Sequence, residues 1–125
     1  MSTSDSTVQT LRHVAIGVGA GIFNSHRIAL DNEATEIVGV ADINPEAGQA
    51  VADELGCPFY TDHKQMLAET KPDVASVVTP HPFHASLAID CFEAGAHVLV
   101  EKPIAVEVAE ADAMVAAAKK ADRLL

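Results

Sequence analysis

Apolar and polar positions along the chain change their spacing in a regular order, which predicts strands and helices in alternation. Short runs rich in valine, isoleucine and alanine indicate buried strands at residues 11–18, 36–42, 57–60, 73–79 and 97–100. Helical spacing or capping residues predict helices at residues 23–30, 45–55, shortly after 62, 84–93 and 106–121. Nearly continuous apolar strands between amphipathic helices are typical of a parallel sheet covered on both faces, so we expect a doubly wound α/β fold.

Residues at the expected helix ends support these boundaries. Asn44 followed by Pro45 favours a helix start, because asparagine caps the first turn and proline fits the first helical position. Gly56 and Gly95 are placed to end helices, and Asp62 is placed to begin one. The last helix has acidic residues near its start and basic residues near its end, which suits the helix dipole.

Composition and charge describe an acidic globular domain. The 125 residues fit one domain, with 49% of them apolar and 21% charged. The net charge of −10 argues against nucleic acid and anionic membranes as partners, since both bind clusters of lysine and arginine. Residues 1–10 are polar and lack a signal peptide's apolar run, so we expect a disordered leader before a domain at 11–125. Cys57 and Cys91 are widely spaced, which favours free thiols and a cytoplasmic location.

A glycine-rich turn follows the first predicted strand, at the carboxyl edge where open parallel sheets bind ligands. Its candidate cofactor-binding residues are Gly17, Gly19, Ala20, Gly21, Ile22 and Phe23. Glycines let the backbone approach a pyrophosphate, and the start of the next helix offers N–H donors. Alternatively, these glycines serve only a tight turn from strand to helix.

The second predicted strand ends at Asp42, 25 residues after Gly17. A carboxylate there can accept hydrogen bonds from both hydroxyls of an adenosine ribose, and it would repel a 2′-phosphate. The next residue, Ile43, offers no positive charge to such a phosphate, which favours NAD over NADP as the cofactor. The alternative is that Asp42 is a turn residue in front of Asn44 and Pro45.

The fourth predicted strand ends in a loop with proline and histidine residues, Thr79-Pro80-His81-Pro82-Phe83-His84. The prolines stiffen this loop beside the expected cofactor crevice. His81 and His84 have a spacing that metal ligands can adopt, but no suitable third ligand is close in the sequence, so we expect no metal site. For His84 we expect a role in capping the next helix or in positioning the cofactor.

The fifth predicted strand ends in Glu101-Lys102-Pro103. A charged pair directly after a buried apolar strand is costly unless it serves a site. Lys102 could hydrogen-bond a substrate hydroxyl or donate a proton during hydride transfer. The alternative is an ion pair at the rim of the sheet.

Together these segments resemble the Gfo/Idh/MocA oxidoreductases, named for glucose–fructose oxidoreductase and inositol dehydrogenase. The run from Gly95 to Pro103 is similar to the family signature, and residues 77–84 are similar to the family's fourth-strand loop. Val40-Ala41-Asp42 resembles the ribose-binding strand end, and His26 matches a recurrent family position. The resemblance covers residues 11–125.

This resemblance implies a Rossmann domain with strand order 3-2-1-4-5, from an NAD(P)-dependent dehydrogenase or reductase of sugars, polyols and related hydroxy compounds. It places Lys102, the expected catalytic residue, near the nicotinamide and the substrate hydroxyl. It also implies a cofactor crevice lined by Glu101, Lys102, Thr79, Pro80, His81 and His84. The nicotinamide would perform hydride transfer while protein groups orient it and exchange a proton.

The sequence departs from the family pattern in two places. The third small residue of the glycine loop falls on Ile22, and the spacing to His26 suggests one additional residue in the loop. The family's C-terminal substrate domain has no counterpart, and the chain stops about where a sixth strand begins. We therefore expect an NAD-binding chain that is weakly active or inactive alone, or, alternatively, a non-catalytic nucleotide-binding module or subunit. An unpaired edge at residues 97–100 and an uncovered apolar face lead us to expect a homo-oligomer.

Overall fold

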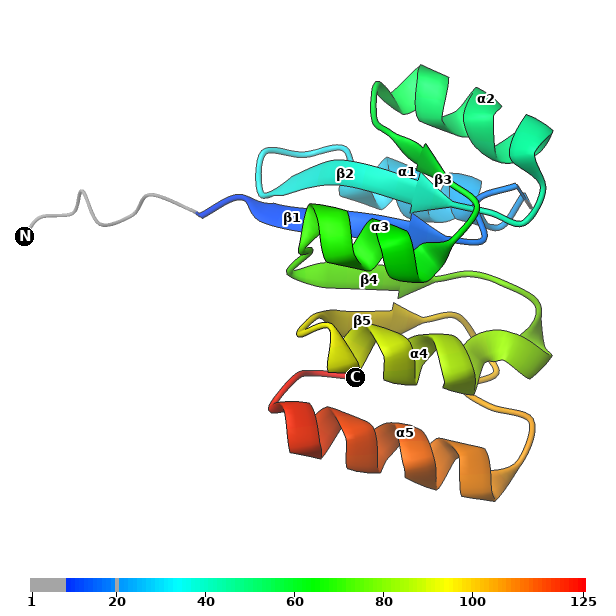
Figure 1. Cartoon of the computed structure of the whole chain (residues 1–125), viewed down its shortest axis with the longest axis vertical. Helices are drawn as coiled ribbons and strands as arrows, with labels where there is room; N and C mark the ends of the chain where they lie inside the picture. The colour runs from blue at the N-terminus through cyan, green and yellow to red at the C-terminus, as the bar shows by residue number, and fades with distance from the viewer. Residues whose placement is uncertain (1–8, 20) are drawn as a thin grey trace, which may run out of the picture.

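The computed structural model describes residues 9–19 and 21–125 and contains one parallel sheet of order β3-β2-β1-β4-β5 (Figure 1). Its strands are β1 (Leu11–Ile16), β2 (Thr35–Ala41), β3 (Phe59–Tyr60), β4 (Val74–Val77) and β5 (His97–Val100). The helices are α1 (Phe23–Leu30), α2 (Pro45–Leu55), α3 (His63–Thr70), α4 (His84–Glu93) and α5 (Val108–Ala121), with a 3₁₀ turn, η2 (His81–Phe83), before α4. This confirms the predicted doubly wound order. Residues 1–8 of the expected leader at 1–10, and the predicted site residue Ala20, lie outside the described residues.

Local side-chain chemistry sets the helix ends much as predicted. The Asn44 side chain accepts hydrogen bonds from two backbone N–H groups in the first turn of α2, and Gly56 ends that helix in the left-handed conformation. Asp62 caps α3 by accepting from the N–H of Lys64. The last helix begins at Val108 rather than at residue 106, because Glu107 is its N-cap and forms a capping box.

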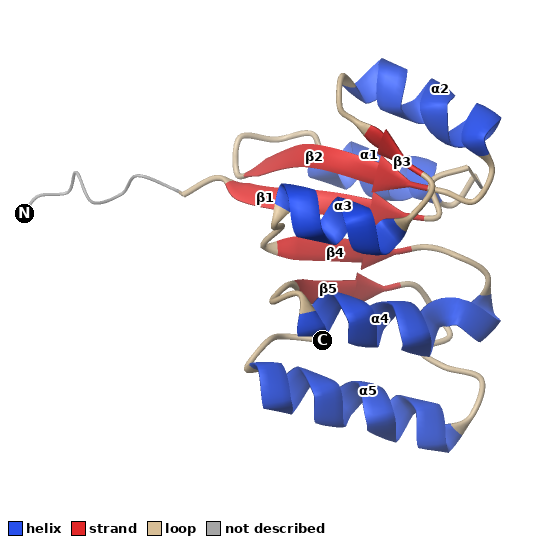
Figure 2. Cartoon of the chain, viewed as in Figure 1, coloured by secondary structure: helices blue, strands red, loops and turns tan. Residues whose placement is uncertain are grey.

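Two apolar cores lie on the two faces of the sheet. On one face, α3, α4 and α5 bury a cluster that includes Val14, Val77, Phe92 and Met114. On the other face, α1 and α2 cover a smaller cluster around Phe23. Figure 2 shows α3 in front of the sheet, α1 behind it, and α5 beside α4 at the end of the molecule. No helix in the described part of the chain is long and apolar enough to cross a membrane.

The expectation of cover on both faces needs correction at β5, where one face is open, in line with the uncovered apolar face that was also expected. The side chain of Val98 is buried in the core under α4, whereas the next residue along the strand, Leu99, is 51% exposed. Successive strand residues point to opposite faces, so Leu99 lies on the face that α1 and α2 cover elsewhere. Within the described residues, the helices on that face reach only part of the sheet.

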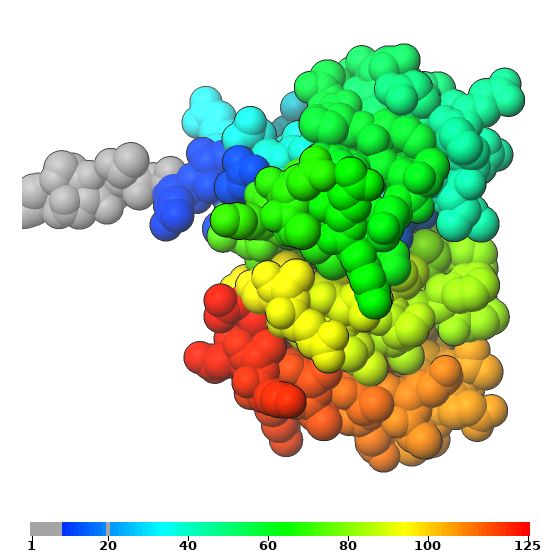
Figure 3. Space-filling view, viewed as in Figure 1, coloured from blue at the N-terminus to red at the C-terminus, as the bar shows by residue number. Residues whose placement is uncertain are grey.

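The expectation of an unpaired edge at β5 also needs correction. The Val98 N–H donates to the carbonyl oxygen of Leu124 at 3.0 Å, and the Leu124 N–H donates to Nδ1 of His97 at 2.9 Å. The Arg123 side chain donates to the Gly95 carbonyl at 2.7 Å. Figure 3 shows the red C-terminal residues lying against the yellow part of the chain. The segment after α5 therefore provides hydrogen-bond partners for part of the β5 edge.

Gly48 provides a test of how α2 packs on the sheet edge. A Cβ atom at Gly48 would overlap the ring of Phe59 in β3. We expect Gly48→Ala to lower the free energy of unfolding by about 1–3 kcal/mol, because the ring or the helix must shift. Gln49→Ala, on the exposed side of the same helix, should change it by less than about 0.5 kcal/mol. Urea denaturation of both variants measures the difference, and equal stabilities would contradict the packing.

Candidate functional site

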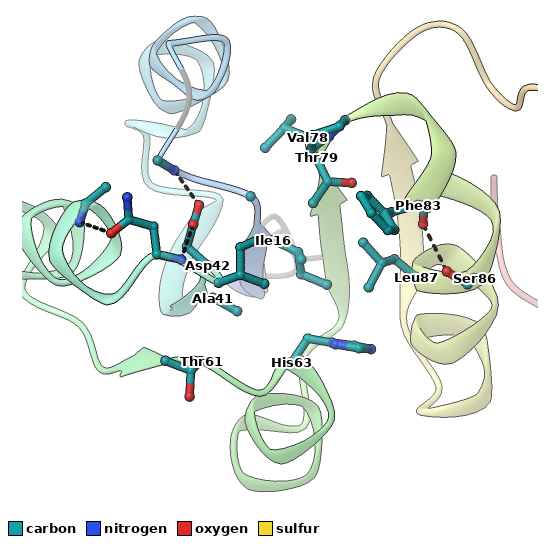
Figure 4. Close-up of a pocket in the computed structure, with 16 residues that line it drawn as sticks. Ile16, Ala41, Asp42, Thr61, His63, Val78, Thr79, Phe83, Ser86 and Leu87 are labelled. Carbon is teal, nitrogen blue, oxygen red and sulfur yellow. Dashed lines mark hydrogen bonds between the residues drawn. The ribbon is translucent and has the colours of Figure 1, made fainter.

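A cleft of about 570 Å³ opens at the carboxyl ends of β1, β2 and β4, where β1 lies between its two neighbours (Figure 4). Strand connections leave in opposite directions at such a point, which is where open α/β sheets bind their ligands. In Figure 4, Ala41 and Asp42 lie on one side of the cleft, and Thr79, Phe83 and Leu87 lie on the other. The lining is mostly apolar, and it contains no lysine or arginine.

Gly17 lets the ends of β1 and β4 approach each other. Its φ is +93°, and a Cβ atom there would lie 2.7 Å from Cγ2 of Thr79 and 2.8 Å from the Thr79 backbone nitrogen. Both the backbone conformation and the space therefore require glycine. This close approach forms the floor of the cleft.

Asp42 is held by backbone N–H groups on both sides of its carboxylate. Oδ2 accepts from the N–H of Gly19 at 2.7 Å, and Oδ1 accepts from the N–H of Asn44 at 2.8 Å. Each carboxylate oxygen has a second lone pair, so the group can still accept hydrogen bonds from a ligand. Ile43 lines the cleft beside it and is 92% exposed. The carboxylate is thus oriented before any ligand arrives.

The wall opposite Asp42 is built by the segment after β4. Thr79 and Pro80 line the cleft, and the turn η2 then presents Phe83, which is 53% exposed. The Thr79 hydroxyl is buried and has no hydrogen-bond partner among the described residues. An unpaired buried hydroxyl is unusual in a folded protein and marks a place where a ligand or water can bond.

His84 connects the loops after β4 and β5. Its ring is fully buried, with Nε2 2.8 Å from the carbonyl oxygen of Thr79 and Nδ1 2.8 Å from that of Pro103. Both nitrogens are therefore occupied, which leaves none for the metal that the spacing to His81 allowed. No cluster of three or more potential metal ligands occurs within residues 9–19 and 21–125.

Glu101, at the end of β5, is bonded to the first helix and to its own neighbour. Its Oε2 lies 2.7 Å from Nε2 of His26 in α1, and its Oε1 accepts from the N–H of Lys102 at 3.0 Å. These two hydrogen bonds lower the pKa of Glu101 below its ordinary value, the bond from His26 being the larger cause. The Lys102 side chain is exposed beside this contact and does not line the cleft.

The structure brings about half of the predicted site residues to the cleft: Gly17, Gly19, Asp42, Ile43, Thr79 and Pro80. Those elsewhere are Gly21, Ile22 and His81, which are exposed, Phe23 and His84, which are buried, and Glu101 and Lys102 at the end of β5. The Phe23 side chain belongs to the core, so only its backbone N–H at the start of α1 remains for a ligand.

Several lining residues were missed by the sequence analysis. Thr61 and His63 follow β3, and Ser86 and Leu87 lie on α4. His63 lines the cleft while its Nε2 lies 2.8 Å from Oδ2 of Asp90. The strand-end argument, applied to the short third strand as to the others, would have found Thr61 and His63.

The contact between His26 and Glu101 gives a prediction about pH. Because the pKa of Glu101 is lower in the folded state, its contribution to stability is present above its ordinary pKa and is lost as the pH falls through the lowered value. We expect His26→Ala to raise the pKa of Glu101 toward its ordinary value. The pH interval between the lowered and the ordinary pKa, over which this contribution to stability is lost, should become narrower. A carboxyl ¹³C NMR titration measures it. His97→Ala, at the other end of β5, is the control; an unmoved Glu101 titration in His26→Ala would contradict the assignment.

Comparison with known proteins supports this reading of the fold. Residues 11–125 match the profile of the Gfo/Idh/MocA family, described as an oxidoreductase family with an NAD-binding Rossmann fold. UDP-N-acetylglucosamine 3-dehydrogenase from Acidithiobacillus ferrooxidans is 36% identical over 111 residues, which cover 88% of this chain and 34% of that protein. Inositol 2-dehydrogenase/D-chiro-inositol 3-dehydrogenase from Halalkalibacterium halodurans is 35% identical over 100 residues, or 77% of this chain and 28% of that protein.

A solved structure agrees with these matches. The WlbA dehydrogenase from Bordetella pertussis, in complex with NADH and UDP-GlcNAcA, is 32% identical with a TM-score of 0.85, covering 94% of this chain and 35% of that one. The chain spans about a third of the length of the relatives it matches. The family confirms NAD as the expected type of cofactor. The chain belongs to the Gfo/Idh/MocA oxidoreductase family, of which residues 11–125 form the NAD-binding Rossmann-fold part.

Proposed function

We propose that the chain holds NAD in the cleft as part of a dehydrogenase that moves hydride to or from a sugar, polyol or related hydroxy compound. The carboxylate of Asp42, fixed by two backbone N–H groups in the lining of the cleft, is the observation that carries the proposal. The substrate class is supported by the names of the relatives, which are dehydrogenases of UDP-N-acetylglucosamine and of inositols.

Asp42 suits an adenosine ribose in both geometry and charge. Its two oxygens are already aimed by the N–H groups of Gly19 and Asn44, and their free lone pairs can accept the two ribose hydroxyls. The cleft lining has no lysine or arginine to bind a 2′-phosphate, and the carboxylate would repel one. NAD is therefore favoured over NADP.

Gly17 supports the same cofactor. Thr79 fills the place that a Gly17 side chain would take, and the Gly17 backbone lines the cleft, so a pyrophosphate would meet bare backbone at the end of β1. The buried hydroxyl of Thr79, which lacks a partner among the described residues, offers one further hydrogen bond on the opposite wall. The remaining predicted contacts of the glycine turn, Gly21, Ile22 and the N–H of Phe23, complete this part of the proposal.

Lys102 is the residue that we propose for proton exchange with the substrate. NAD would supply the hydride acceptor when bound, and the exposed side chain of Lys102 can hydrogen-bond a substrate hydroxyl, receive its proton as the neutral amine and return a proton as the ammonium ion. The backbone of Lys102 is held by Glu101, which is in turn held by His26. In this arrangement Lys102 is the catalytic residue and Glu101 fixes its backbone.

We further propose that this chain alone turns over substrate weakly or not at all. The relatives it matches are about three times as long, and the rest of their length has no counterpart among these 125 residues. The alternative, a non-catalytic nucleotide-binding module or subunit, uses the same cleft and differs only in the absence of turnover with any partner. Robust oxidation of a polyol by the pure chain would overturn the proposal of weak activity.

Calorimetry with a variant of Asp42 tests the cofactor site. The unaltered chain should bind NAD saturably and more tightly than NADP. Asp42→Ala should weaken NAD binding by about ten- to a hundredfold, because a charge-assisted pair of hydrogen bonds is lost, and should reduce the preference over NADP. Asp53→Ala, on the exposed side of α2, should bind NAD normally. Absence of saturable heat at millimolar NAD would reject the proposal.

Self-association also remains a prediction. Since Leu124 occupies part of the β5 edge, its main support is the open face around Leu99. Light scattering over a concentration series should give a dimer or a larger species. A monomer at the highest concentration would contradict it.

A further inference from the structure

The surroundings of His84 place an unusual demand on its ring. The side chain sits at the start of α4, is fully buried, and has each of its two nitrogens 2.8 Å from a backbone carbonyl oxygen. The carbonyl of Thr79 lies in the segment after β4, and that of Pro103 lies in the loop after β5. These distances are those of well-formed hydrogen bonds.

The hydrogen-bond inventory of the imidazole ring decides what these distances mean. A neutral ring has one N–H and one bare nitrogen lone pair, whereas a carbonyl oxygen has no proton to give. Either neutral tautomer would therefore leave a lone pair facing an oxygen at 2.8 Å, away from water. Only a ring with protons on both nitrogens can donate to both carbonyls.

We propose that His84 is a doubly protonated clamp that ties the loop after β5 to the loop after β4 and thereby positions Lys102. Pro103 directly follows Lys102, and Thr79 forms a wall of the cleft, so the clamp joins the proposed proton-exchange residue to the cofactor wall. The role of Lys102 rests on the proposed function, whereas the state of the His84 ring does not. His84 acts through backbone carbonyls and is a positioning residue.

A second contact holds the same loop from the opposite direction. Glu101 accepts from the Lys102 N–H and from His26, so the residues before and after Lys102 are each fixed by a histidine from a different helix. The ring centre of His81 lies 5.8 Å from that of His84, and Glu101 and Lys102 directly precede the Pro103 that His84 contacts.

A simpler role, in which His84 only packs at the start of α4, makes a different prediction. Such a residue needs one hydrogen bond and is satisfied as a neutral ring. The number of protons on the His84 ring therefore distinguishes the two roles: two protons for a clamp, one for a residue that only packs. This number can be measured without any cofactor.

The first experiment is ¹⁵N NMR of the whole chain with labelled histidine at neutral pH, without NAD. The ring of His84 should show two protonated nitrogens that exchange slowly with solvent. His97 provides the comparison within the same spectrum, because its Nδ1 accepts the Leu124 N–H and must be unprotonated. One unprotonated nitrogen in His84 would overturn the proposal, whatever the result of NAD calorimetry.

The second experiment measures positioning of the loop by amide hydrogen exchange. His84→Gln can serve only one of the two carbonyls, so we expect exchange at Lys102 and Ile104 to become faster by about tenfold, as loss of one charge-assisted hydrogen bond predicts. His97→Gln, at the far end of β5, should leave these two amides unchanged. Unchanged exchange in His84→Gln would refute the positioning role. If that variant does not fold, the ring spectrum of the unaltered chain decides the matter.

Discussion

The ends of β1 and β4 lie so close together at Gly17 that no side-chain carbon fits between them. This constraint determines where the cleft can be, because it sets the separation of the two strands whose connections leave in opposite directions. Asp42 on one side and Thr79 on the other then face a common space. The N-caps of α2 and α3 fix where these helices begin, and the two apolar cores hold the helices against the sheet.

Histidines supply many of the long-range polar contacts around this framework. Five of the six form hydrogen bonds to groups distant in the sequence, on Ser76, Glu101, Asp90, Pro103 and Leu124. His13, bonded to Ser76 inside the sheet, has its pKa lowered to about 4, chiefly by burial, so it is neutral at ordinary pH. Each such side chain joins two elements that the backbone alone would leave free to move.

Much of the fold and part of the site could be predicted from the sequence. The strands, the helices and Asp42 were predictable because strand ends, glycines and caps are local signals, whereas the strand order was implied by the family resemblance. The partners of His84 and Glu101 were not, because they lie 19 and 75 residues away and depend on how the helices pack. The same is true of Leu124, whose pairing with β5 follows from the path of the chain after α5. Phe23 was assigned to the cofactor loop because its position suggested it, while its apolar ring is drawn into the core.

The lining of the cleft contains no lysine or arginine, and the chain has a net charge of −10. As a result, salt should affect the rate of cofactor binding differently from the lifetime of the complex. At low ionic strength the field of the acidic surface repels a dinucleotide that also carries negative charge, and salt screens that repulsion. The hydrogen bonds that we propose between the cleft and the dinucleotide are much less sensitive to screening. Added salt should therefore speed the encounter while leaving the lifetime of the complex nearly constant, which is the reverse of the behaviour of phosphate sites built from cationic side chains.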